Sequence, residues 1–203
     1  MSQMENKKGF KGTGRMSVET AKDWIHTFFF EGADVIIDYY ADDFVFEDLT
    51  FFQTIDNKED LYRAFVQFSN PQAAEGTSGT HDFDIIRYDG GLAGEHRAVM
   101  LPKPDRWTQE EWDQWAAEAS LGGHRKDYDE WANITWIWRA THTVDEFCGL
   151  TGVKGKTTYV RGQTFHLYKD RQIVREYTQW NFREVAVQVG AYPMPEKFWL
   201  ADK

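Results

Sequence analysis

Hydrophobic residues recur at helical spacing in three stretches near the N-terminus. Ser17 can cap the first helix, and Gly32 is placed to end it. The second stretch covers 35–40 and the third covers 58–68, each with one apolar face. Between these two, the side chains at 44–49 alternate as they do in a short strand. The predicted buried positions are Ala21, Trp24, Ile25, Phe28, Val35, Ile36, Tyr39, Tyr40, Leu61, Ala64, Phe65 and Phe68.

Longer alternating stretches follow in the rest of the chain. They predict strands at 81–88, 134–147, 157–169 and 173–182. Asp89-Gly90-Gly91 is typical of a turn after the first of them, and the polar run 169–172 predicts a hairpin between the last two. Helices followed by antiparallel strands predict an α+β domain, with the helices packed on one face of a curved sheet.

Three segments lie outside this pattern. Residues 1–16, rich in Lys and Gly, are predicted to be a disordered tail, and 193–203 to be a C-terminal extension. The segment 101–132 is predicted to be a helical insertion. Its tryptophans Trp107, Trp112 and Trp115 suggest a lid over a pocket, and the alternative is a helix packed outside or against a dimer partner.

Composition narrows the class of protein. The 203 residues include 33 acidic and 23 basic side chains, so the net charge of −10 argues against nucleic acid as a partner. A lone Cys148 excludes a disulfide framework or a cysteine-based zinc site within one chain. With neither a signal-peptide pattern nor an apolar run of about 20 residues, the expectation is a cytoplasmic protein away from membranes. Nine Trp, nine Tyr and 15 Phe suggest a part of the molecule lined with rings.

Two segments carry a family resemblance by the order of their residues. The first is Tyr-Tyr-Ala-Asp-Asp-Phe-Val-Phe-Glu-Asp at 39–48, and the second is Gly-Gln-Thr-Phe-His-Leu-Tyr-Lys-Asp-Arg-Gln-Ile-Val-Arg-Glu-Tyr at 162–177. With Gln188-Val189-Gly190 after the last strand, they resemble the SnoaL-like polyketide cyclases of the nuclear transport factor 2-like superfamily. The similarity covers 18–100 and 133–192, within a single domain at 17–192.

The resemblance implies a cone of curved antiparallel sheet closed by helices, with an apolar pocket at one end and a homodimer through the sheet. Alternation at 134–142 supports such a pocket, because two tryptophans share one face of the strand with His142. The same face could instead be solid core or a dimer interface. The predicted substrate-binding residues are Trp24, Tyr40, Phe52, Trp136, Trp138 and Tyr177.

Asp48 is the favoured catalytic base. It matches the general base that the resemblance implies for the ketosteroid isomerase branch, and an apolar pocket would raise the pKa of its carboxyl toward neutrality. The alternative is a carboxylate that only caps a turn. The companion tyrosine and acid of the isomerase would fall near Trp24 and Gly162, so the full isomerase triad is not predicted.

Asn181 and His142 are the other two catalytic candidates. Asn181 stands where the cyclases carry an Asp, and an amide can bind a carbonyl or enolate but cannot shuttle a proton. His142, followed by Asp145 and Glu146, is a plausible base. Both residues could instead make purely structural hydrogen bonds. The weaker candidates are His81 and His166.

No metal-binding motif, phosphate loop or nucleophile elbow occurs in the sequence, so cofactor-free and metal-free chemistry is predicted. The resulting hypothesis is an isomerase, cyclase or lyase that transfers protons on a small hydrophobic, polycyclic or aromatic molecule. The alternative is a non-catalytic small-molecule-binding or dimerisation module of the same fold.

Overall fold

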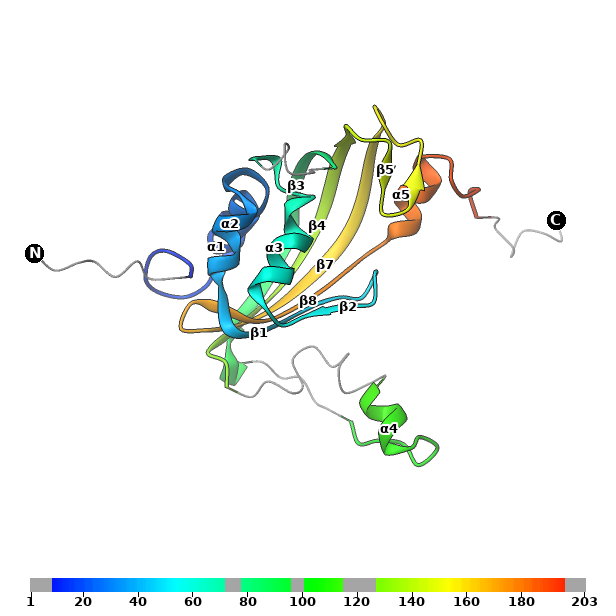
Figure 1. The fold of residues 1–203 in the computed structure, drawn as a ribbon. Helices are drawn as coiled ribbons and strands as arrows, with labels where there is room; N and C mark the ends of the chain where they lie inside the picture. The colour runs from blue at the N-terminus through cyan, green and yellow to red at the C-terminus, as the bar shows by residue number, and fades with distance from the viewer. Residues whose placement is uncertain (1–8, 72–77, 96–100, 115–126, 196–203) are drawn as a thin grey trace, which may run out of the picture.

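The computed structural model describes residues 9–71, 78–95, 101–114 and 127–195. A curved sheet forms the centre, and the N-terminal helices lie against one of its faces (Figure 1). The helical elements are α1 (Val18–His26), η1 (Thr27–Glu31), α2 (Ala33–Ile36), η2 (Ile37–Tyr39), α3 (Lys58–Val66), η4 (Ala93–Glu95), α4 (Gln109–Trp112) and α5 (Phe182–Gln188).

The main sheet has six strands in the order β2-β1-β8-β7-β4-β3. Neighbouring strands are antiparallel except for β1 and β8, which run parallel. The strands are β1 (Tyr40–Asp48), β2 (Gln53–Ile55), β3 (Gly79–Leu92), β4 (Glu130–His142), β7 (Thr157–Lys169) and β8 (Gln172–Trp180), and a separate hairpin contains β5 (Glu146–Phe147) and β6 (Leu150–Thr151). The predicted α+β architecture is confirmed.

Local signals in the sequence explain the helix boundaries. The backbone N–H of Ser17 donates to Thr20 Oγ1 at 3.1 Å before α1, and Asn57 Oδ1 accepts from the Asp60 N–H at 2.9 Å before α3. Gly32 ends η1 with a φ of +132°, a backbone conformation that favours glycine. The predicted first helix therefore begins and ends where its capping residues indicate.

The two predicted turns have different outcomes. The hairpin at 169–172 is confirmed, with both Asp170 and Arg171 at positive φ between β7 and β8. The turn at Asp89-Gly90-Gly91 is wrong, because β3 continues to Leu92 and pairs along its length with β4. Gly90 lies so close to the carbonyl of Trp131 that a Cβ would come within 2.7 Å of it. These glycines serve close packing of two long strands, not chain reversal.

Part of the predicted disordered tail is packed. Residues 1–8 lie outside the described residues, but Phe10 is buried between Tyr39 and Tyr168, with ring centroids 4.5 and 5.7 Å away. The guanidinium of Arg171 donates to the carbonyl oxygens of Phe10, Lys11 and Gly14. Residues 9–16 thus contribute an aromatic side chain to the core, which their Lys- and Gly-rich composition conceals.

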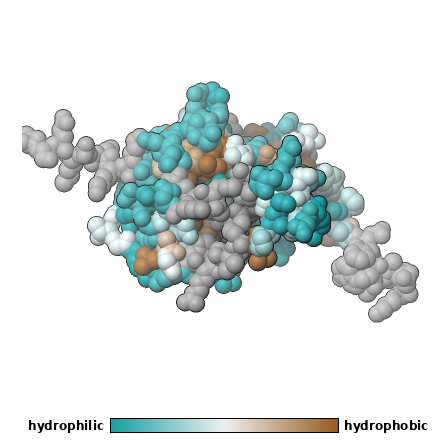
Figure 2. All heavy atoms as spheres, turned by 90° about the horizontal axis from the view of Figure 1, so that it is seen from below, coloured by the Kyte–Doolittle hydropathy of each residue, from teal (hydrophilic) through white to brown (hydrophobic). Residues whose placement is uncertain are grey.

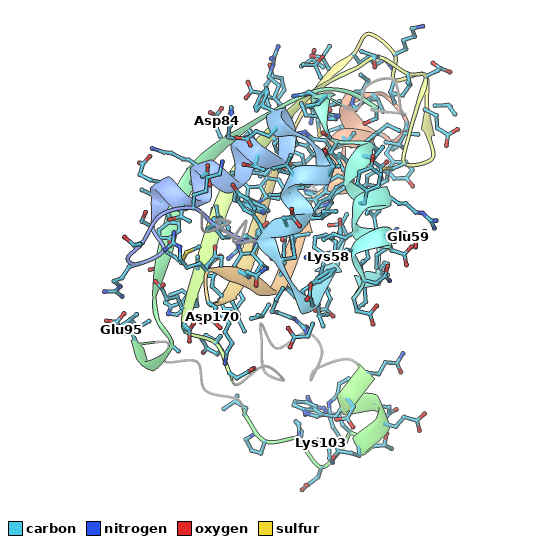
Figure 3. All side chains as sticks on the ribbon, turned by 60° about the vertical axis from the view of Figure 1, so that its left-hand side comes forward. Lys58, Glu59, Asp84, Glu95, Lys103 and Asp170 are labelled. Atoms are coloured by element: carbon cyan, nitrogen blue, oxygen red, sulfur yellow. The ribbon has the colours of Figure 1, made fainter. Side chains whose placement is uncertain are left out.

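The described part of the insertion does not form a lid. Glu95, which precedes it, lies near the β7–β8 turn at Asp170 (Figure 3), and the Asp170 N–H donates to Asp129 Oδ2 at 2.8 Å. The predicted end at 132 is wrong, because β4 already begins at Glu130. The helix α4 then lies on the side of the sheet opposite α1–α3 (Figure 1). Thr108 caps it, and Trp107 packs against Trp112 with ring centroids 6.2 Å apart. Trp115 lies outside the described residues.

The two faces of the sheet differ in chemistry. Most buried aromatic residues lie on the face under α1–α3. The other face carries a smaller apolar cluster of Ala41, Phe165, Leu167 and Val174. Viewed from that side, hydrophilic residues predominate around small separate hydrophobic areas (Figure 2). Among the described residues, none of the helices has the length and apolar character that crossing a membrane requires.

Candidate functional site

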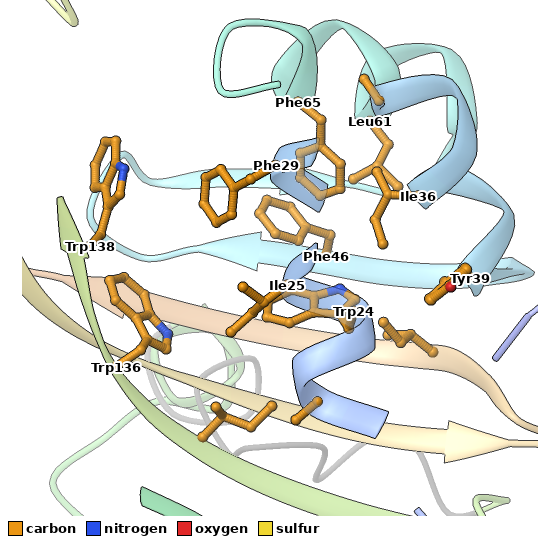
Figure 4. Packing of buried hydrophobic residues seen from close by; sticks show 14 of the residues in the cluster. Trp24, Ile25, Phe29, Ile36, Tyr39, Phe46, Leu61, Phe65, Trp136 and Trp138 are labelled. Carbon is orange, nitrogen blue, oxygen red and sulfur yellow. The ribbon is translucent and has the colours of Figure 1, made fainter. Parts of the chain in front are cut away.

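A cavity of about 160 Å³ lies between the helices and the sheet. Its walls are aromatic, with rings from α1, η1, α3 and four strands, several of which can be followed in Figure 4. Exposed Gln53 and half-buried Gln67 are at its rim. The lining residues are Trp24, Phe28, Phe29, Phe46, Asp48, Phe51, Gln53, Ala64, Phe65, Gln67, Phe68, Phe83, Trp136, Trp138, Thr164, Glu176, Thr178 and Trp180.

Strand alternation positions the floor of this cavity. In β4, every second residue from Ala132 to His142 is buried, so Trp136 and Trp138 both face the helices. On β8 the inward set includes Glu176, Thr178 and Trp180. The face that the sequence predicts for 134–142 is therefore confirmed as a buried face.

Asp48 ends β1 with its carboxyl at the cavity wall. Oδ1 accepts from the backbone N–H groups of Thr50 at 2.8 Å and Phe51 at 3.3 Å, and Oδ2 accepts from Trp180 Nε1 at 3.1 Å. Burial raises the pKa of this carboxyl above its ordinary value, and these donors only partly offset the effect. The side chain is thus held in one orientation while its proton affinity is increased.

Glu176 is a second carboxyl in the cavity wall, and it is buried. The Tyr40 hydroxyl donates to Oε2, and His166 Nε2 lies 3.1 Å from the same oxygen. Burial and the adjacent Glu176 charge raise the pKa of Tyr40 well above 10, so the phenol keeps its proton and remains a donor. Glu176 was not among the predicted site residues, although strand alternation places it on the same face of β8 as Thr178 and Trp180.

A chain of hydroxyls completes the polar part of the floor. Trp136 Nε1 donates to Thr164 Oγ1 at 3.0 Å, and the Thr164 and Thr178 hydroxyls are 2.9 Å apart. These contacts fix the Trp136 indole over the β7–β8 pair. Directly below it lies Gly162, the residue that faces Trp136 across the β4–β7 pairing.

Gly162 sets the position of that indole, because a Cβ at residue 162 would overlap the Trp136 ring. We expect Gly162→Ala to lower the free energy of unfolding by about 1–3 kcal/mol, the usual cost of overpacking a core. Urea denaturation measures it, and Gly94→Ala is the matched control because a Cβ there meets nothing within 4 Å. In a Trp136→Phe background the cost should shrink; an equal cost in both backgrounds would contradict this contact.

The structure brings four of the nine predicted site residues to the cavity: Asp48, Trp24, Trp136 and Trp138. Tyr40 is fully buried beneath it and contacts Glu176 instead of lining the wall. Phe52 is 89% exposed in the tight turn after β1, and its neighbour Phe51 lines the cavity instead. Tyr177 faces the opposite side of the sheet, because it alternates with Glu176.

The other two predicted catalytic residues are also away from the cavity. His142 is buried at the far end of β4, with Nε2 3.0 Å from Thr158 Oγ1, and Phe147 of the β5–β6 hairpin covers it at a ring-centroid distance of 5.0 Å. Asn181 caps α5, and its carbonyl accepts from the Glu184 N–H at 2.9 Å. Asp48, His142 and Asn181 therefore do not meet in one site, and the prediction that they form a catalytic group is wrong. The β5–β6 hairpin covers His142, and the last residue of β8 at the cavity wall is Trp180, not Asn181.

Metal-ligating side chains are not gathered in the described part of the chain. No group of three or more His, Cys, Asp or Glu residues there is placed to hold a metal ion. Among the described residues of the cavity wall, Asp48 and Glu176 are the two acids, and none is a histidine or cysteine.

Comparison with known proteins identifies the fold. No protein-family model matches the sequence. A comparison with curated protein sequences also gives no match. Solved structures do match: AclR from Streptomyces galilaeus has a TM-score of 0.54 at 12% identity, over 89% of this chain and 85% of that one.

Two further neighbours give the fold its description. A protein from Shewanella putrefaciens, named as a SnoaL-like polyketide cyclase, has a TM-score of 0.52 at 12% identity, over 88% of this chain and 89% of that one. The second is a hypothetical protein from Catenulispora acidiphila with a ketosteroid isomerase-like fold, solved in complex with trimethylamine. It has a TM-score of 0.52 at 9% identity, over 84% of this chain and 91% of that one. The chain therefore has the fold of the SnoaL-like polyketide cyclases and ketosteroid isomerase-like proteins.

Proposed function

We propose that this protein is a cofactor-independent enzyme that transfers protons on a small hydrophobic molecule, with Asp48 as the general base. One observation carries the proposal: a carboxyl with a raised pKa is held rigidly in the wall of an aromatic cavity. The fold supports it as well, because some neighbours with this fold are named as polyketide cyclases and another as having a ketosteroid isomerase-like fold, although fold alone does not fix activity.

The geometry suits removal of a proton from carbon. Backbone donors from Thr50 and Phe51 hold Oδ1, and Oδ2 keeps a lone pair beyond the one that accepts from Trp180. Asp48 would take the proton, the electron pair would move into the π system of the substrate, and the acid would return the proton to another atom. An isomerase, a cyclase and a lyase share this first step.

The size of the cavity limits the substrate. A volume of about 160 Å³ is close to that of protein cavities that hold one benzene ring. A polycyclic molecule would have to extend past Gln53 at the rim. The proposal is therefore a single-ring or similarly small apolar substrate, narrower than the polycyclic class that the sequence suggested.

The test is proton exchange at carbon. Single-ring ketones, with and without an amino group, would be incubated with the protein in D₂O, and deuterium uptake beside the carbonyl followed by NMR. We expect Asp48→Asn to slow exchange by about 100-fold or more, because an amide cannot accept the proton. Asp84→Asn, an exposed position on β3, is the matched control and should keep the wild-type rate.

The competing function is a binding module without turnover. It is favoured by the three hydrogen bonds to Asp48, two of which are those of a turn cap. In that case ligands bind, Asp48→Asn lowers thermal stability, and no substrate exchanges its protons. Wild-type exchange rates in a folded Asp48→Asn protein would remove Asp48 as the base. The homodimer through the sheet and the cytoplasmic location stay predictions from the sequence.

A further inference from the structure

The charge inside the cavity is of one sign. Asp48 and Glu176 are its ionisable lining residues, and no Lys, Arg or His stands among the described residues of the wall. Proton transfer on a neutral apolar substrate needs the rings and one carboxyl, that of Asp48, and gains nothing from a second carboxyl at Glu176. The pair of acids therefore points to a property of the ligand that hydrophobicity does not explain.

Polar side chains converge on one carboxyl oxygen of Glu176. The Tyr40 hydroxyl donates to Oε2, and His166 Nε2 faces the same atom at 3.1 Å. On the other side of the imidazole, Nδ1 is 2.8 Å from the Tyr168 hydroxyl. Burial keeps the Tyr168 phenol protonated, so it can donate to Nδ1 and hold the imidazole ring in place beside Glu176. Oε1 makes no hydrogen bond to the described residues and remains available as an acceptor.

Three of the four tryptophans of the wall offer π surface but no free N–H, and the fourth, Trp24, has a buried indole N–H without a hydrogen-bond partner among the described residues. The indole N–H groups of Trp136, Trp138 and Trp180 already donate to Thr164 Oγ1, His81 Nδ1 and Asp48 Oδ2, at 3.0, 3.2 and 3.1 Å. An anion in the cavity would therefore find few hydrogen-bond donors. A cation would find aromatic rings and carboxylate oxygens, both of which attract positive charge.

We propose that the cavity selects a small organic cation, an ammonium group joined to an apolar or aromatic group, over a neutral molecule of the same shape. The proposal rests on the proposed function only in placing the ligand in the same cavity. Its volume of about 160 Å³ restricts the ligand to about one ring with a substituted ammonium. The rings would hold the apolar part, and Asp48 and Glu176 would balance the charge.

Two probes of equal size test whether the cavity prefers a cation to a neutral molecule. Phenyltrimethylammonium and tert-butylbenzene differ in charge but have the same number of heavy atoms and nearly the same shape. Their binding can be followed by the fluorescence of the tryptophans that line the cavity. We expect the cation to bind about tenfold or more tightly than the neutral probe, and benzenesulfonate, an anion, to bind more weakly than both.

Variants locate the source of the preference. Glu176→Gln and Asp48→Asn should each reduce the ratio of the two dissociation constants, and Asp84→Asn on the exposed side of β3 should leave it unchanged. The wild-type comparison stands even if Glu176→Gln does not fold. Equal or tighter binding of tert-butylbenzene, or no binding of the cation, would overturn the inference. If deuterium exchange at carbon still depended on Asp48, the proposed function would stand without the preference for a cation. The proposed function and this inference can therefore fail separately.

Discussion

Replacement of Glu47 by Gln is expected to lower the free energy of unfolding by about 3–5 kcal/mol. Glu47 on β1 pairs with Arg175 on β8, and both side chains are less than 10% exposed. The substitution keeps the shape but removes the negative charge, and so leaves a guanidinium in a site from which water is largely excluded. Because a domain is stable by only about 5–15 kcal/mol, urea denaturation should detect the loss easily.

Two further variants separate the charge from its surroundings. Glu59→Gln breaks an exposed pair with Arg63 on α3 and should cost less than about 0.5 kcal/mol. Glu47→Leu combined with Arg175→Met removes both charges and should recover much of the loss. If Glu47→Gln costs no more than Glu59→Gln, water reaches the pair and the buried-charge argument fails. The cavity lies on the other face of the sheet, so probe binding should survive in each folded variant.

Periodic patterns predicted the fold well because each buried face repeats along one element. The alternation of Trp136 and Trp138 identified a buried strand face without any knowledge of what covers it. Single residues at the ends of elements were harder. Phe52 and Asn181 lie where the chain turns, so alternation no longer determines which way a side chain points. The turn placed at Asp89-Gly90-Gly91 failed because glycine also serves close strand packing.

The candidate site depends on contacts between residues far apart in the sequence. Asp48 was predicted from its match to the general base of the ketosteroid isomerase branch, but the burial that raises its pKa involves elements more than a hundred residues away. Glu176 was overlooked because an acid in a strand usually faces water. Only the packed structure shows that Tyr40 and His166 converge on it. His142, on the predicted face, is separated from the cavity by a two-stranded hairpin that the alternation pattern does not reveal.

His81 should make the protein sensitive to acid. The Ser78 hydroxyl donates to the Gln67 carbonyl at 2.9 Å and so accepts from His81 Nε2 at 3.3 Å, while Trp138 Nε1 donates to Nδ1 at 3.2 Å. Both nitrogens are thus used by the neutral imidazole, and a second proton on Nδ1 would face the indole N–H. Burial, together with His142, lowers the pKa of His81 to about 4.

The direction of the pH effect follows from this shift. Between about pH 6.5 and pH 4 the unfolded chain binds a proton at His81 that the folded chain does not, so stability is complete above this window and falls as the pH is lowered. The total loss from His81 is about 3 kcal/mol. Urea denaturation of the wild type at pH 7 and at pH 4.5 should show most of this loss in the free energy of unfolding. Residue 81 cannot titrate in His81→Gln, so this variant should lose less stability between the same two pH values.

The variants must be compared at both pH values, because carboxyls and His142 also titrate. His142 has a pKa lowered by burial and remains in both proteins, so the difference between them keeps only its interaction with His81. His26→Gln removes an exposed histidine on α1 and serves as the matched control, with the acid sensitivity of the wild type. Identical pH dependence in the wild type and in His81→Gln would mean that the folded protein accommodates the charged imidazole. The Trp138 indole would then have to give up its hydrogen bond, and the cavity wall next to it would change shape in acid.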